Sequence, residues 1–287
     1  MPFLEPALGI SSQLDYDGCN YFTEHIAMIS LFTGIGALLL YLLSAWNQNK
    51  ASASQVSKRG YLLSLLGWGL HSANLSLHLF TQAGLLLDLG AALSLTAWAV
   101  IGVILISSLR NPVANLLIFA APIAALAIAV DTVSVPSITG RQYSHGILVH
   151  IIASILGYAL FAVAACQAVL LIYQNRHLKH HQASRFITSL PPLQTMESLL
   201  FEVLAAGQIF LTLALVTGFV YVDDLFAQQL AHKTILSLIA WVIFSILLWG
   251  HYRLGWRGRM AIRWTLWGFA NLALAFFGTK LVVEFVL

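Results

Sequence analysis

Long apolar segments dominate the chain and constrain its fold more than any other feature. A membrane-spanning helix needs about 20 mostly apolar residues to cross a hydrocarbon core about 30 Å thick. Eight segments qualify, at approximately 26–46, 61–80, 89–109, 113–130, 147–174, 203–222, 234–252 and 264–284. A backbone exposed to lipid must satisfy its own hydrogen bonds, so each segment is predicted to be helical. The sequence therefore predicts an all-α, polytopic membrane helix bundle of about eight transmembrane helices.

Composition excludes a water-soluble domain. Only 9% of the residues are charged and 59% are hydrophobic, whereas a soluble domain carries about 25% charged residues. So few charges cannot cover a globular surface, and membrane lipid is the expected surrounding. The net charge of +3 comes from short loops. Because no soluble segment carries a basic stripe with interleaved aromatic residues, no nucleic-acid partner is expected.

The charged residues are segregated between the two sides of the predicted membrane. With eight spans, one side receives most of the 14 basic residues, namely Lys50, Lys58, Arg59, Arg110, Arg176, Lys179, Arg185, Arg253, Arg257, Arg259 and Arg263. Most acidic residues fall on the opposite side. They include Asp88 and Asp131, which come after the second and fourth predicted spans and are predicted to be external. Because basic loops remain in the cytoplasm, both termini are predicted to lie outside.

The chain is expected to form one membrane domain. Residues 1–25 are acidic and precede the first apolar run, so they are predicted to be an external N-terminal segment. Residues 26–287 are predicted to form a single transmembrane domain. The sequence contains no Gly-rich phosphate loop, Walker motif or nucleophile elbow. The chain is therefore not expected to be an enzyme.

Ten histidines stand out among so few charges. His71 lies near the middle of the second predicted span, about 15 Å from its inner end at 1.5 Å per residue. His150 lies near the outer start of the fifth span and His251 at the inner end of the seventh. A membrane imidazole either bonds to a neighbouring helix or ligates haem iron. Depth alone leaves both interpretations of these histidines open. As haem ligands, His71 would face His251 toward the inner leaflet, and His150 would work with His78 or His145 near the outer surface.

Other residues of the spans suit either interpretation. Asn74, Gln167 and Gln208 are predicted to form hydrogen bonds between helices. Aromatic side chains can wall a macrocycle, and the tryptophans among them are also typical interfacial anchors; they are Trp68, Trp98, Tyr158, Phe161, Trp241, Trp249, Trp267 and Phe269.

A GWRG sequence follows the seventh predicted span. Gly255 and Gly258 allow the backbone to turn tightly there. Four arginines surround this turn, at positions 253, 257, 259 and 263. They can hold lipid phosphates or haem propionates at the inner surface, or they can act only as a positive anchor on the cytoplasmic side.

Two segments resemble a known family. Residues 146–174 match a pattern of histidine, six or seven residues and then Y-A-x-F, with His150 and Tyr158–Phe161 at the matching positions. Residues 235–270 contain His251 followed by the GWRG stretch. Both look like the membrane core of the cytochrome c assembly protein family, which includes CcsA and HemX proteins. The chain is most similar to its YpjD-like inner-membrane subgroup, and the resemblance covers about residues 61–287.

The resemblance implies a function and a set of site residues. Better-known members of the family bind haem and help to deliver it to apocytochrome c outside the membrane. The chain is therefore expected to be a multi-pass protein of the bacterial cytoplasmic (inner) membrane that binds haem b in haem handling or c-type cytochrome assembly. The implied cofactor-binding residues are His71, His150, His251, Trp256 and Arg257, with the three histidines as haem-iron ligands.

The chain also departs from the family pattern. The external tryptophan-rich WWD segment of the family is missing from this chain. The sequence QQLAHKTI stands in that region, and only Lys233 is retained. A second external histidine near the last helix is absent as well. These losses favour an alternative, in which the chain is a non-catalytic regulatory or assembly subunit of another inner-membrane protein, such as a transporter, with degenerate haem sites. A transport function of its own is disfavoured, because Asp and Glu lie at the ends of the spans.

Overall fold

The computed structural model describes residues 7–50, 57–81, 84–111, 113–134, 141–179, 192–222 and 231–278. Nearly all of them are helical, in α1 (Ala7–Lys50), α2 (Lys58–Leu79), α3 (Leu89–Ser107), α4 (Leu117–Val133), α5 (His145–Lys179), α7 (Leu193–Tyr221), α8 (Ala231–Leu254) and α9 (Arg259–Ala273). A 3-10 turn, η1 (Ala114–Leu116), precedes α4, and a π-helical turn, η2 (Leu274–Gly278), follows α9. Each predicted apolar segment coincides with one of these helices as far as the described residues reach, which confirms the all-α prediction.

Six stretches of the described residues are long and apolar enough to cross a membrane, namely Met28–Lys50, Leu89–Ser107, Ala114–Val133, His145–His177, Leu193–Tyr221 and Ala231–Leu254. The chain is thus a polytopic α-helical membrane protein. The other two predicted spans form α2, which carries many polar side chains, and α9, which has 15 residues and two arginines. Their complete passage through the bilayer, and the location of both termini outside, stay predictions.

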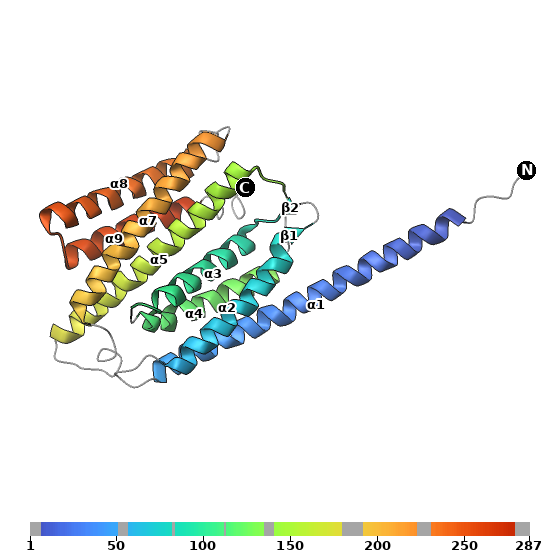
Figure 1. The fold of residues 1–287 in the computed structure, drawn as a ribbon, viewed down its shortest axis with the longest axis horizontal. Helices are drawn as coiled ribbons and strands as arrows, with labels where there is room; N and C mark the ends of the chain where they lie inside the picture. Colours follow the sequence, from blue (N-terminus) through green and yellow to red (C-terminus); the bar gives the residue numbers. More distant parts are fainter. Residues whose placement is uncertain are drawn as a thin grey trace, which may run out of the picture.

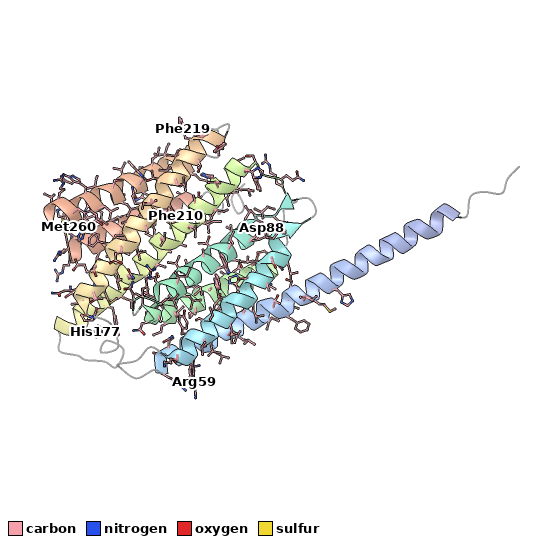
Figure 2. All side chains as sticks on the ribbon, viewed as in Figure 1. Arg59, Asp88, His177, Phe210, Phe219 and Met260 are labelled. Carbon is pink, nitrogen blue, oxygen red and sulfur yellow. The ribbon has the colours of Figure 1, made fainter. Side chains whose placement is uncertain are left out.

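The helices run alternately up and down. Figure 2 shows Arg59, His177 and Met260 toward one end of the bundle, and Asp88 and Phe219 toward the other. These residues lie at or near the connections α1–α2, α2–α3, α5–α7, α7–α8 and α8–α9, so the chain reverses direction at each of these. This alternation places the basic connections together, in the arrangement that the charge pattern predicts.

The first helix is longer than its predicted span. It runs unbroken from Ala7 to Lys50, so most of the predicted N-terminal segment shares one helix with the span. Figure 1 shows the N-terminal part of α1 extending beyond the other helices.

The helices pack in two neighbouring groups. In one group α1 packs against α2 and α4, and α3 packs against α4 and α2; in the other, α5 packs against α7 and α9, and α8 against α9 and α7. Contacts between α3 and α5 join the two groups. A continuous hydrophobic cluster passes through both and includes Tyr41, Ile101, Leu117, Phe161 and Phe244. This cluster joins the two groups, whose helices lie side by side in Figure 1.

A short hairpin closes one end of the first group. Strands β1 (Phe80–Thr81) and β2 (Gly84–Leu85) pair in antiparallel register. The backbone of Leu85 also exchanges hydrogen bonds of 2.9 and 3.0 Å with that of Arg141, just before α5. The hairpin was not predicted, because strands of two residues show no period in sequence.

Candidate functional site

His71 is fully buried in α2, with both ring nitrogens engaged. Its Nδ1 lies 3.3 Å from the hydroxyl of Tyr41 on α1, and its Nε2 lies 2.9 Å from the hydroxyl of Ser94 on α3. The ring of Tyr41 also meets the imidazole edge to face, with 5.9 Å between the ring centroids. His71 therefore joins three helices through hydrogen bonds in this structure, and neither nitrogen is left free for iron.

A buried polar network continues from His71 toward the hairpin. The carboxyl of Asp131 on α4 lies close enough to Ser94 and His78 to interact with both. The Nε2 of His78 bonds in turn to the hydroxyl of Ser30 on α1. The Asn74 amide donates to the carbonyl of Ser30 at 2.7 Å, which confirms the predicted hydrogen bond between helices.

Asp131 is the member of this network that sequence reasoning misplaced. It was predicted to be an external residue beyond the fourth span, but it lies within α4 and is only 6% exposed. Its Oδ2 atom has no hydrogen-bond partner among the described residues. The helical register explains why Asp131 is buried. It follows the buried residues Ile128 and Ala124 by three and seven positions, so it lies on the same face of α4.

The predicted hydrogen bonds of the two glutamines have different outcomes. The amide of Gln208 on α7 donates to the Ser245 hydroxyl on α8 at 2.7 Å, as predicted. Gln167 on α5 is buried, and its side-chain oxygen finds no partner in the described part of the chain.

Several of the aromatic side chains that were predicted to surround a macrocycle stack on one another instead. Trp68 and Trp98 stack with 5.1 Å between ring centroids and 12° between their planes. Phe161 stacks in the same way on Phe244, at 3.9 Å and 7°. Trp267 is 69% exposed and faces outward, as an interfacial or lipid-facing side chain does.

His150 lies between α5 and α7. Its Nδ1 lies 2.8 Å from the carbonyl oxygen of Ala214. The ring fits against α7 because residue 218 is glycine, where an added Cβ would lie 2.9 Å from the Cε1 atom of His150. A carbonyl oxygen can only accept, so Nδ1 carries the proton and the lone pair of the neutral ring is on Nε2. No described residue bonds to that Nε2.

His251 has the same chemistry at the opposite end of the second group. Its Nδ1 donates to the Trp256 carbonyl oxygen at 3.0 Å, again leaving the lone pair on Nε2 without a partner among the described residues. The imidazole stacks on Phe201 of α7, with 3.5 Å between ring centroids and 14° between planes.

The GWRG turn is built as the sequence predicts. Gly255 and Gly258 adopt φ values of 68° and 60°, which favour glycine. The indole of Trp256 folds back over Gly250, where an added Cβ would lie 2.4 Å from the ring. The backbone N–H of Gly258 donates to Oε1 of Glu197 at 2.5 Å. The turn is thereby fixed to the start of α7, while the side chain of Arg257 is exposed.

The three predicted ligands are not brought together. His150 bonds at Ala214 and His251 stacks on Phe201, so 13 residues of α7 separate their levels, a rise of about 20 Å at 1.5 Å per residue. His71 belongs to the group of α1–α4, where α2 packs against α1 and α3, whereas α8 packs against α7 and α9. The pairing of His71 with His251 is therefore absent from this structure.

Comparison with known proteins identifies the family. The model of the family described as "Cytochrome C assembly protein" matches residues 58–287. The inner membrane protein YpjD of Escherichia coli K12 is 37% identical over 149 residues, which are 52% of this chain and 56% of YpjD. A 28.8 kDa protein of Azospirillum brasilense is 33% identical over 154 residues, 53% of this chain and 57% of the relative. These two alignments thus span about half the length of the relatives.

A more distant relative aligns over more of the chain. The protein HemX of Brevibacillus brevis is 21% identical over 262 residues, which are 87% of this chain and 93% of HemX. No solved structure matches. The family match over most of the chain, together with the helices long enough to cross a membrane, leads to one conclusion. The chain belongs to the cytochrome C assembly protein family and is a multi-pass protein of the inner membrane.

Proposed function

We propose that this protein binds haem b and acts in haem handling or c-type cytochrome assembly, without enzymatic chemistry of its own. The observation that carries the proposal is the state of two imidazoles. His150 and His251 each donate the Nδ1 proton to a backbone carbonyl, which directs the Nε2 lone pair away from that bond. Histidines that ligate metals are held in this way, because the second hydrogen bond fixes the tautomer and the ring orientation.

The surroundings of these two residues support the same role. Trp256 lies beside His251, and the exposed guanidinium of Arg257 on the same turn is suited to a haem propionate. Because His150 and His251 contact α7 at positions 13 residues apart, each would hold a separate haem. Bound haem would supply an iron centre, either as cargo or for electron transfer.

The proposal gives His71 a different role from the other two histidines. Both of its nitrogens bond to hydroxyls within the bundle. We therefore propose His71 as a structural residue that joins α1, α2 and α3, although the family resemblance implies a ligand at this position.

A haem spectrum tests the proposal. Protein purified in detergent and loaded with haem should show a Soret absorbance. The variants His150→Ala and His251→Ala should each lower it, and the double variant should remove it. His232→Ala is the control and should leave the spectrum unchanged, because this exposed histidine on α8 is not a candidate ligand. Folded protein that gains no Soret band when haem is added would overturn the proposal.

A second candidate function follows from the same residues. The bonded state of His71 and the missing WWD segment favour a regulatory or assembly subunit of another inner-membrane protein. This candidate predicts a stoichiometric membrane partner that co-purifies with the wild-type chain. It also predicts that the His150→Ala and His251→Ala variants keep that partner and its function.

A further inference from the structure

A cavity opens on the outer face of the bundle, away from the candidate haem ligands. Its volume is about 720 Å³, and its walls include Leu42 and Trp46 of α1, Ile118 and Phe119 of α4, and Val169 and Tyr173 of α5. Leu42, Phe119 and Val169 are between 44% and 53% exposed, so the cavity is a groove on the lipid-facing surface.

The packing of the helices explains the groove. α4 packs directly on α1, whereas α5 packs on α3 and touches η1, the short turn before α4. α1 and α5 therefore form the two sides, and the outward side chains Ile118 and Phe119 form the floor. A groove with this apolar lining is suited to an acyl chain, because its walls come from helices long and apolar enough to cross the bilayer.

The groove becomes polar and basic at one end. Asn49 and Tyr173 line it there. The ammonium of Lys50 lies over the ring of Trp46, 4.4 Å from its centroid, so a groove-lining aromatic holds this cation in place. On α5, Arg176 lies seven residues after Val169 and is therefore on the same face of the helix, with its side chain exposed.

The depth of this end agrees with its chemistry. Lys50 and Arg176 stand at the C-terminal ends of α1 and α5, on the side where the basic residues gather and which the positive-inside rule assigns to the cytoplasm. Basic pockets between membrane helices on the cytoplasmic side bind anionic lipid headgroups. The aromatic rings of Trp46 and Tyr173 are typical of the interface between headgroups and acyl chains.

We propose that this groove is a specific site for an anionic phospholipid of the inner leaflet. An acyl chain would lie along Leu42, Ile118 and Phe119, and the phosphate would lie between Lys50 and Arg176. The site is independent of the proposed haem function, because none of its lining residues is a candidate haem ligand.

Lipid titration followed by native mass spectrometry tests the site. Delipidated protein in detergent is titrated with phosphatidylglycerol or with phosphatidylcholine of the same acyl chains. Wild-type protein should retain phosphatidylglycerol preferentially. The double variant Lys50→Gln/Arg176→Gln should lose most of the preference, by a factor of about five for each cation removed. The matched control Lys58→Gln/Arg59→Gln removes two exposed cations from the same side of the bundle, on α2, and should keep the preference.

A second variant tests the apolar part of the groove without changing charge. Ala45 also lines the groove, and Ala45→Phe should fill part of it and lower the retention of phosphatidylglycerol. Equal retention of both lipids by wild-type protein would overturn the proposal. So would a dimer that covers this face and dissociates in the Ala45→Phe variant, since the occupant would then be a protein helix.

Discussion

The imidazole of His150 packs against the backbone of Gly218, where a side-chain carbon would lie 2.9 Å from Cε1 and 3.1 Å from Nδ1. The pair sets how closely α5 and α7 approach near this end of the bundle. It also allows the Nδ1 atom of His150 to reach the carbonyl of Ala214. The orientation of a candidate haem ligand thus depends on the absence of a side chain on the neighbouring helix.

Substitution of this glycine should therefore displace the histidine. We expect Gly218→Val to destabilise the protein by about 1–3 kcal/mol, because an overfilled helix contact forces the backbone apart. The variant should also lower the Soret absorbance of the haem-loaded protein if His150 is a ligand. Thermal unfolding in detergent and the absorption spectrum measure the two effects. Gly69→Ala is the control, because an added Cβ there meets no atom within 4 Å, and it should preserve both properties.

His71→Ala should weaken the bundle without removing haem. The change leaves the buried hydroxyls of Tyr41 and Ser94 without their imidazole partner, at a cost of about 1–3 kcal/mol. Thermal unfolding should therefore shift to lower temperature, while the haem content per folded protein should equal that of wild type. A variant that stays as stable as wild type but loses its Soret band would instead identify His71 as a ligand.

Gly250→Ala should disrupt the GWRG turn. The added Cβ would overlap the indole of Trp256, at 2.4 Å from the ring. Because the carbonyl of Trp256 holds Nδ1 of His251, displacement of the indole should also reorient that imidazole. Lower thermal stability and a weaker Soret band are the expected results. The double variant Gly250→Ala/Trp256→Ala removes the overlap and should recover part of the stability, whereas an equally unstable double variant would contradict this explanation.

Glu197 should protect the same turn from proteolysis. Its carboxylate accepts the N–H of Gly258, 61 positions later in the chain. Glu197→Ala removes this acceptor and should cost about 0.5–1.5 kcal/mol, the typical net value of one hydrogen bond. Trypsin should then cleave faster after Arg257 and Arg259. Glu197→Gln retains a side-chain oxygen and should be cleaved at a rate closer to wild type. Equal rates for all three proteins would mean that the bond does not order the turn.

Much of this architecture could be predicted from the sequence, because apolar runs of membrane length force a helix. The tight turn at Gly255 and Gly258 was predicted for a similar reason, since glycine adopts positive φ at little cost. The hydrogen bonds of His71 could not be assigned, because they depend on which helices become neighbours. Asp131 was misplaced because its position after an apolar run is typical both of a loop and of a last buried helical turn.

The backbone pairing of Leu85 with Arg141 has a consequence for how the sequence can vary. Its hydrogen bonds use only main-chain atoms, so the pairing itself requires no particular side chain at either position. Gly84 differs, because its φ is 123° and an added Cβ would lie 2.5 Å from the carbonyl group of Arg141. The side chain of Leu85 packs on the buried cluster of Leu75, Leu79 and Ala91. Among homologues that retain this hairpin, we therefore expect residue 141 to vary, residue 85 to stay apolar and position 84 to stay glycine. An alignment of such homologues would show an invariant glycine followed by an apolar residue, with no ligand involved.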